Sequence, residues 1–288
     1  MSGPRSRKVG QPVSVPSAVN TIVKTCVGPV EVMIVGEGKK SALVFISHGL
    51  GDCSSLRQIA LQLVAASPEL SIVTWSRPGC GLSPCSDPSL SDPLFYEASV
   101  VLPALMNALG IPAAHFLAHA DGASVALMFA GLFPKRTLGI VALAPYGLAD
   151  AHLRAAVEAL PIDEIDSEVS EQLVGRHPDP VLVFQRWRRQ RISELDRRWS
   201  GLSHFSSVSA PLTIVQGARD EFSSLDQTAT IAGSVAGQVN WVTLRNIGHS
   251  LHYEVPEQVT ALVLSHLRCV DALLELPASS RGTLAAVA

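Results

Sequence analysis

Short apolar runs separated by polar and glycine-containing segments recur along most of the chain. The first two, at residues 21–27 and 30–35, flank Gly28-Pro29 and predict a hairpin of two strands. Residues 41–47 form a continuous apolar run, which is typical of a strand buried on both faces. Strand and helix patterns then alternate, with strands expected at 71–75, 115–117, 138–144, 212–216 and 239–244, and helices at 56–66, 95–109, 123–133, 225–232 and 257–267.

This alternation predicts βαβ units, and therefore an α/β fold with a doubly wound, mostly parallel sheet covered by helices on both faces. We expect one α/β core made of residues 21–146 and 210–270. Residues 147–209 interrupt it without any strand-like run, and a helical insertion of this kind is a candidate lid. Flexible tails are expected at residues 1–20 and 271–288.

The insertion has an unusual charge distribution, with an acidic stretch at residues 163–171 and six arginines between residues 186 and 198. For most of these arginines a solvated polar face is the favoured interpretation. Arg186, Arg189 and Arg191 are the alternatives for receiving a substrate carboxylate. Trp187 either lines the roof of a pocket or anchors the insertion to the sheet.

Composition narrows the function classes. The 288 residues are 47 % hydrophobic and 16 % charged, which excludes disorder for most of the chain. A formal net charge of -3 gives no electrostatic footprint for nucleic acid. The uncharged stretch 98–120 is interrupted too often by proline, glycine and histidine to span a membrane. The oligomeric state does not follow from the sequence.

The five cysteines and the first twenty residues bear on the compartment. The cysteines are odd in number, with no CxxC pair and no metal-ligand spacing, so we expect reduced thiols and no metal site. No apolar segment follows the basic residues near the N-terminus, so no secretory signal is expected. Both observations favour a cytoplasmic protein.

The segment 116–124 joins a buried strand to an apolar helix through a sharp turn. Small residues at Ala118 and Gly122 bracket Ala120, which is the pattern of a nucleophile elbow with Ala120 in the middle position. Shifting the frame to Asp121 would place His119 where a small side chain is needed. An aspartate nucleophile is therefore disfavoured.

Four motifs in this order make the chain resemble the α/β-hydrolase superfamily from about residue 30 to residue 267. Besides the elbow they are the His-Gly loop at 48–51, the Arg-Pro-Gly-x-Gly-x-Ser turn at 77–83, the Gly-x-x-Asp segment at 217–220 and the Gly-His segment at 248–249. The resemblance implies that His249 is the base, that Asp220 orients it, and that the N–H groups of Leu50 and Asp121 form the oxyanion hole. This chemistry implies a small-molecule substrate and no cofactor. We expect substrate contacts at Gly49, Trp187 and Arg186.

Several site residues have alternatives. His252 and His48 compete with His249, and Glu221 competes with Asp220, but the helix-entry context and the Gly-x-x-Asp spacing favour His249 and Asp220. The Asp121 carboxylate either contacts a substrate amino group or caps the following helix. For the remaining candidates we expect structural roles. His119 and His115 are expected to be packed core histidines, and Cys80 and Cys85 ordinary loop thiols.

The chain departs from the family at the nucleophile, where Ala120 stands in place of serine. A methyl group cannot attack a carbonyl, so the printed sequence should not form an acyl-enzyme. Alanine here is either a deliberate substitution or the mark of a natural inactive relative. The retention of Asp220 and His249 favours the first.

Three functions follow. The favoured one is a hydrolase of an ester, a thioester or an activated C–C bond, inactivated at Ala120. The alternatives are a ligand-binding pseudohydrolase, and a lyase or cofactor-free dioxygenase that uses the Asp220–His249 dyad without a serine.

Overall fold

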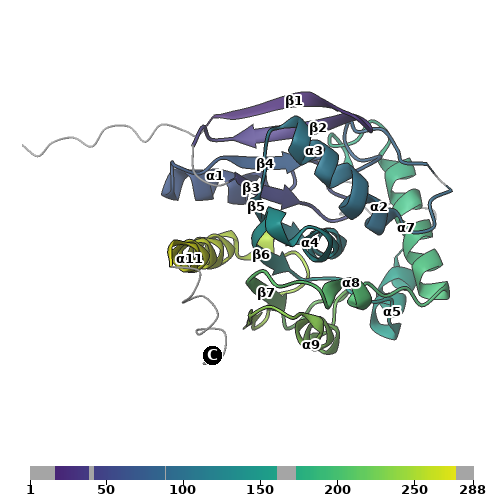
Figure 1. The fold of residues 1–288 in the computed structure, drawn as a ribbon. Coiled ribbons are helices and arrows are strands. Elements are labelled where there is room, and N and C mark those ends of the chain that lie inside the picture. Colours follow the sequence, from purple (N-terminus) through teal and green to yellow (C-terminus); the bar gives the residue numbers. More distant parts are fainter. Residues whose placement is uncertain (1–16, 39–41, 88, 161–172, 277–288) are drawn as a thin grey trace, which may run out of the picture.

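The computed structural model describes residues 17–38, 42–87, 89–160 and 173–276, and it has the predicted α/β architecture (Figure 1). Eight strands form one sheet in the order β1-β2-β4-β3-β5-β6-β7-β8, parallel from β4 to β8. The strands are β1 (Ala18–Thr25), β2 (Gly28–Val35), β3 (Ala42–Ile46), β4 (Ile72–Trp75), β5 (Ala114–His119), β6 (Thr137–Leu143), β7 (Leu212–Gly217) and β8 (Val239–Leu244). The prediction of a doubly wound, mostly parallel sheet is confirmed.

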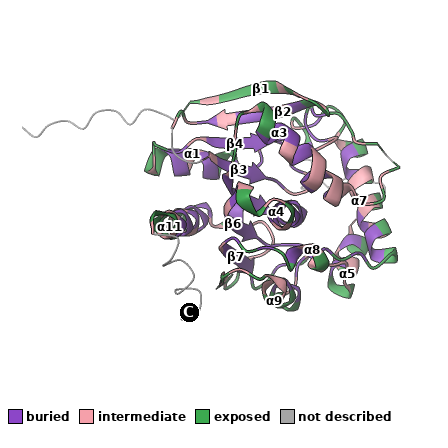
Figure 2. Cartoon of the chain, in the orientation of Figure 1, coloured by how far each residue is buried: buried purple, intermediate pink, exposed green. Residues whose placement is uncertain are grey.

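The hairpin of β1 and β2 forms one edge of the sheet. Both of its pairings, β1 with β2 and β2 with β4, are antiparallel. The ladder starts at Ala18, which pairs with Val35, so the expected tail of residues 1–20 is wrong for residues 18–20. These residues are held by main-chain hydrogen bonds to β2, and β1 is mostly exposed on its outer side (Figure 2).

Alternate residues of the central strands point into two separate cores. In β3, Val44 and Ile46 belong to the larger core, whereas Leu43 and Phe45 belong to the other. Helices α1 (Arg57–Ala66) and α11 (Pro256–Glu275) cover the face of Leu43 and Phe45 and contact each other. The opposite face is covered by α3 (Leu102–Ala108), α4 (Asp121–Leu132), α8 (Leu202–Phe205) and α9 (Leu225–Ser234).

The helix expected at 95–109 is continuous but not uniform. It consists of α2 (Pro93–Tyr96), the π-helical turn η1 (Glu97–Val101) and α3. Pro103 lies just after the π-turn, and a proline inside a helix cannot donate the usual main-chain hydrogen bond. The wider turn brings the Glu97 side chain into the protein interior.

The last helix extends farther than the sequence predicts. Helix α11 continues to Glu275, so the flexible tail expected from residue 271 is wrong for residues 271–275. The Asp271 carboxylate lies 3.4 Å from Nε2 of the buried His115, an anchor that the apolar pattern did not reveal. Residues 277–288 lie outside the described residues.

Two long helices of the insertion lie at the side to which the arrows of β3 and β4 point (Figure 1). These are α5 (Ala151–Ala159) and α7 (Pro180–Asp196), which pack against each other, whereas the short α8 packs on the core helix α4. Leu148 and Ser200 form a bridge across the base of the insertion. The whole acidic stretch 163–171 lies in the segment 161–172, outside the described residues. The remaining short elements are η2 (Pro134–Arg136) and α10 (Leu251–Glu254).

Two further predictions concern membrane-spanning helices and the pairing of the cysteines. Among the described helices, none is both long enough and apolar enough to cross a bilayer. All five cysteines lie in described segments and are unpaired.

Candidate active site

The turn between β5 and α4 has the backbone of a nucleophile elbow. Ala120 adopts φ 53° and ψ -122°, a conformation that a residue with a Cβ rarely tolerates. Its N–H donates to the Leu143 carbonyl at 3.0 Å, and its carbonyl accepts from the Tyr146 N–H at 3.1 Å. Main-chain hydrogen bonds to the end of β6 and to the loop after it thus hold the strained turn in place.

Gly122 explains why the elbow needs small residues. A Cβ at this position would lie 2.5 Å from the Ser47 carbonyl oxygen and 2.6 Å from that of Ile46, both main-chain atoms of the strand and loop beside the turn. Gly122→Ala should therefore lower the free energy of unfolding by about 1–3 kcal/mol, the range typical of overpacking. Denaturant unfolding monitored by circular dichroism measures this change.

Gly233→Ala is the matched control for that substitution. Gly233 lies in α9 and a Cβ there would meet no atom within 4 Å, so alanine should leave the stability unchanged or raise it by up to about 1 kcal/mol. Equal effects of the two substitutions would contradict the packing argument.

His249 and Asp220 form an ion-pair geometry at the carboxyl end of the sheet. Both Asp220 carboxylate oxygens lie 3.0 Å from His249 Nδ1. The carboxylate also accepts from the N–H groups of Phe222 and Ser223 at 2.8 Å and from Gln216 Nε2 at 2.8 Å. Burial would raise the pKa of Asp220, but the His249 contact and these donors outweigh it and lower the pKa. Asp220 is thus held ionised beside the imidazole.

The competing acid and base candidates lie around the same cavity. Glu221 is exposed and is one of the residues that line it. His252 is buried on α10, and His48 accepts the Leu50 N–H through Nδ1. The geometry brings together Asp220 and His249, the pair that the motif spacing favours.

The two expected oxyanion donors differ in availability. The Asp121 N–H belongs to the first residue of α4 and so has no partner within the helix. The Leu50 N–H instead points to His48 Nδ1 at 3.3 Å, within its own loop. Binding of an oxyanion at this second donor would require that contact to open.

The Asp121 side chain neither caps α4 nor stands free for a substrate amino group. One oxygen accepts from Arg77 at 2.9 Å, and the other lies 3.5 Å from Arg191 of the insertion helix α7. Arg77 also donates to Glu97 at 2.6 Å, and Arg191 to Glu194 at 3.0 Å. The two arginines and three carboxylates form a buried charge cluster that connects the elbow to the insertion.

Arg191 departs from the solvated face expected for the insertion arginines. Only 2 % of it is exposed, whereas Arg189, Arg197 and Arg198 are exposed as expected. Its guanidinium lies over the Tyr146 ring, 4.8 Å from the centroid. Burial would lower the pKa of Arg191, but the neighbouring carboxylates outweigh it and raise the pKa.

Arg186 and Gly49 are not part of the cavity lining, in contrast to the substrate contacts expected for them. The Arg186 guanidinium donates to the Gly79 carbonyl and contacts Cys85 Sγ at 2.9 Å, on the outer side of the insertion. Gly49 is needed for packing, because a Cβ would lie 2.6 Å from both Asp121 Oδ2 and Trp187 Cδ1. Trp187 itself does line the cavity.

A cavity of about 420 Å³ lies between the elbow and the insertion. The insertion supplies most of the apolar side chains of its lining together with two arginines, and the core supplies the other polar side chains. The apolar lining includes Leu153, Ala156, Leu160, Leu173, Phe184 and Trp187, and the polar lining includes His48, His119, Asp121, Arg176, Arg191 and His249. Such a cavity suits a small molecule with an apolar part and one polar reacting group.

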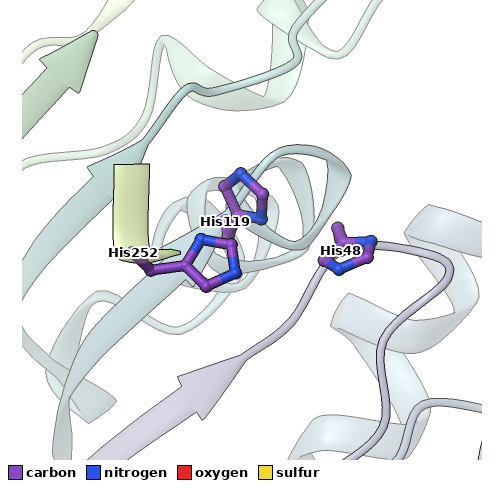
Figure 3. Close-up of side chains that lie close together, drawn as sticks. All are labelled: His48, His119 and His252. Atoms are coloured by element: carbon purple, nitrogen blue, oxygen red, sulfur yellow. The ribbon is translucent and has the colours of Figure 1, made fainter. Parts of the chain in front are cut away.

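Three other histidines surround the base of this cavity, a grouping that the sequence did not signal. His48 lies in the loop after β3, His119 ends β5 and His252 lies on α10; Figure 3 shows His119 and His252 side by side with His48 across from them. Burial lowers the pKa of His48 to about 4 and that of His119 and His252 well below its usual value. The three rings are therefore neutral at physiological pH.

A strained elbow with an Asp–His pair at the carboxyl ends of a mostly parallel sheet defines the class of hydrolases built on α/β sheets. The model of the Alpha/beta hydrolase family matches residues 43–262, and the chain belongs to this family.

Solved structures agree with this assignment at the level of the fold. Similar ones include a membrane phospholipase A described as a bacterial virulence factor (18 % identity over 88 % of this chain and 87 % of that one, TM-score 0.70). A putative lipase from Acinetobacter baumannii is 16 % identical over 90 % and 93 % of the two chains, with a TM-score of 0.70. A proline iminopeptidase from Mycobacterium smegmatis is 16 % identical over 89 % and 100 %, with a TM-score of 0.65. No curated protein matches the chain.

Proposed function

We propose that this site is that of a serine hydrolase whose nucleophile is replaced by Ala120, and that it acts on an ester, a thioester or an activated C–C bond of a small molecule. The observation that carries the proposal is the strained backbone at Ala120, φ 53°, in the same cavity as the Asp220–His249 pair. An alanine gains nothing from this strain, whereas a serine there would present its hydroxyl at the head of α4.

The chemistry requires a hydroxyl at position 120. Its oxygen would attack the substrate carbonyl carbon while His249 Nε2 takes the proton, and Asp220 would stabilise the imidazolium. The Asp121 N–H, joined by that of Leu50, would bind the oxyanion. His249 would then return the proton to the leaving group, and water would release the acyl group in a second round.

The experiment is the substitution Ala120→Ser followed by reaction with a fluorophosphonate probe. We expect labelling to approach one probe per chain, because the probe reacts with an activated serine, whereas the chain with Ala120 stays unlabelled. Intact-mass spectrometry measures the adduct. The double variant Ala120→Ser with His249→Gln is the control and should label far more slowly. A folded Ala120→Ser chain that takes up no probe would contradict the proposal.

A second candidate rests on the dyad alone. The His249–Asp220 contact at 3.0 Å does not depend on residue 120, so the pair can remove a proton from a substrate in the chain as it stands. This function, a lyase or cofactor-free dioxygenase, would give turnover with Ala120 that disappears in His249→Ala. Binding of a ligand without turnover in either chain would instead indicate a pseudohydrolase.

A further inference from the structure

Three histidines, two of them buried and one half-buried, converge on one point from separate parts of the chain. His48 follows β3, His119 ends β5 and His252 lies on α10 (Figure 3). One ring nitrogen from each lies within 4.8 Å of the other two. The ring centroids of His119 and His252 are 4.5 Å apart, and those of His48 and His119 are 5.3 Å apart.

Three ring nitrogens of this cluster have no hydrogen-bond partner among the described residues. Both ring nitrogens of His252 and Nδ1 of His119 are buried and accept or donate no hydrogen bond. His119 is 1 % exposed and His252 is 2 % exposed, so bulk water does not reach them. Leaving a buried polar group unpaired is costly, and several such groups at one place indicate a bound species that satisfies them.

A hydrogen bond fixes which nitrogen of His119 is available. Its Nε2 lies 3.0 Å from the His249 carbonyl oxygen, which can only accept, so Nε2 carries the proton. Nδ1 of the neutral ring therefore presents a lone pair toward the cluster. A histidine whose other nitrogen donates to a carbonyl is the arrangement that orients metal ligands in proteins.

The geometry points to a three-histidine site for a divalent transition metal of the zinc class, formed by His48, His119 and His252. Imidazole nitrogens suit zinc, copper and nickel, and the cluster has no oxygen ligands of the kind that calcium or magnesium requires. Because His48 and His119 also line the cavity, a fourth coordination position would face it.

Metal binding would require small movements of the rings. Zinc binds nitrogen at about 2.0–2.1 Å, which brings three tetrahedral ligands to roughly 3.4 Å from one another. The His48 ring would also exchange its contact with the Leu50 N–H for the metal, either at Nδ1 itself or by moving its proton there. In both cases the Leu50 N–H, an expected oxyanion donor, would be released toward the cavity.

The test is zinc binding by the chain with Ala120, purified without a polyhistidine tag and stripped with a chelator. Isothermal titration with Zn²⁺ alone should show one ion per chain. His252→Gln should weaken binding at least about 100-fold, since even an outer-shell change costs about 10–100-fold. Replacement by Co²⁺ should give the absorption bands of four-coordinate cobalt.

His266→Gln is the matched control. His266 is also buried and also has an unpaired ring nitrogen, but it lies near His115, outside the cluster. It should leave zinc affinity unchanged. His48→Gln, a change at a half-buried loop position, provides a second variant should His252→Gln fail to fold. Zinc affinity equal in the parent, His48→Gln and His266→Gln chains, or no binding at all, would show that water alone fills the cluster. This readout needs no turnover, so its result is independent of the proposed hydrolase activity.

Discussion

In the Ala120→Ser background, Asp220→Asn is expected to lower the rate of acylation about 10⁴-fold, the loss typical of Ser-His-Asp triads. The Asp220 carboxylate accepts from four donors: His249, Gln216 and two main-chain N–H groups. The asparagine side chain has an NH₂ group in place of one oxygen, and this group would face one of the four donors. The amide also carries no charge to stabilise the imidazolium. The burst of nitrophenol from a p-nitrophenyl ester measures the rate.

Asp226→Asn in the same background is the control, since Asp226 is an exposed residue of α9 away from the cavity. It should leave the burst unchanged, and circular dichroism should show that both variants are folded. A fall of less than tenfold in a folded Asp220→Asn chain would mean that Asp220 does not act through His249.

The fold was predictable because its signals are local. Each central strand is a short apolar run, and each covering helix has apolar residues at helical spacing, so their alternation alone indicates the parallel sheet. Boundaries were less predictable where a single contact decides them. Asp271 lies in the part of α11 beyond the predicted end of the helix, and it contacts His115 of β5. The pattern of apolar positions does not indicate that these two polar residues meet.

The candidate site likewise contains residues that the sequence predicted and residues that it did not. Asp220, His249 and the elbow occur at fixed places relative to strand ends, so their motifs can be read along the chain. The charge cluster and the histidine cluster join residues far apart in sequence, such as Arg77 with Asp121 and His48 with His252. No periodicity relates such residues. Arg191 could have been suspected, since Glu194 three positions later is its helical neighbour.

The same charge cluster leads to the largest expected loss of stability. Arg77→Met should lower the free energy of unfolding by about 3–5 kcal/mol, because it leaves buried carboxylates without their cation. Arg77 is 3 % exposed and contacts both Glu97 and Asp121, and its attraction to them outweighs burial, so that its pKa is raised. Methionine fills similar volume, which separates the loss of charge from the loss of packing.

Arg154→Met is the matched control for this substitution. Arg154, like Arg77, forms ion pairs with two carboxylates, Glu158 and Asp196 at 3.2 and 3.3 Å, but its side chain is 40 % exposed. Water screens such pairs, so the change should leave the unfolding midpoint in urea unmoved. If the two substitutions shifted the midpoint equally, burial would not be what makes the Arg77 cluster stabilising. If only Arg77→Met shifts the midpoint, the buried charge cluster between the elbow and the insertion helix stabilises the fold.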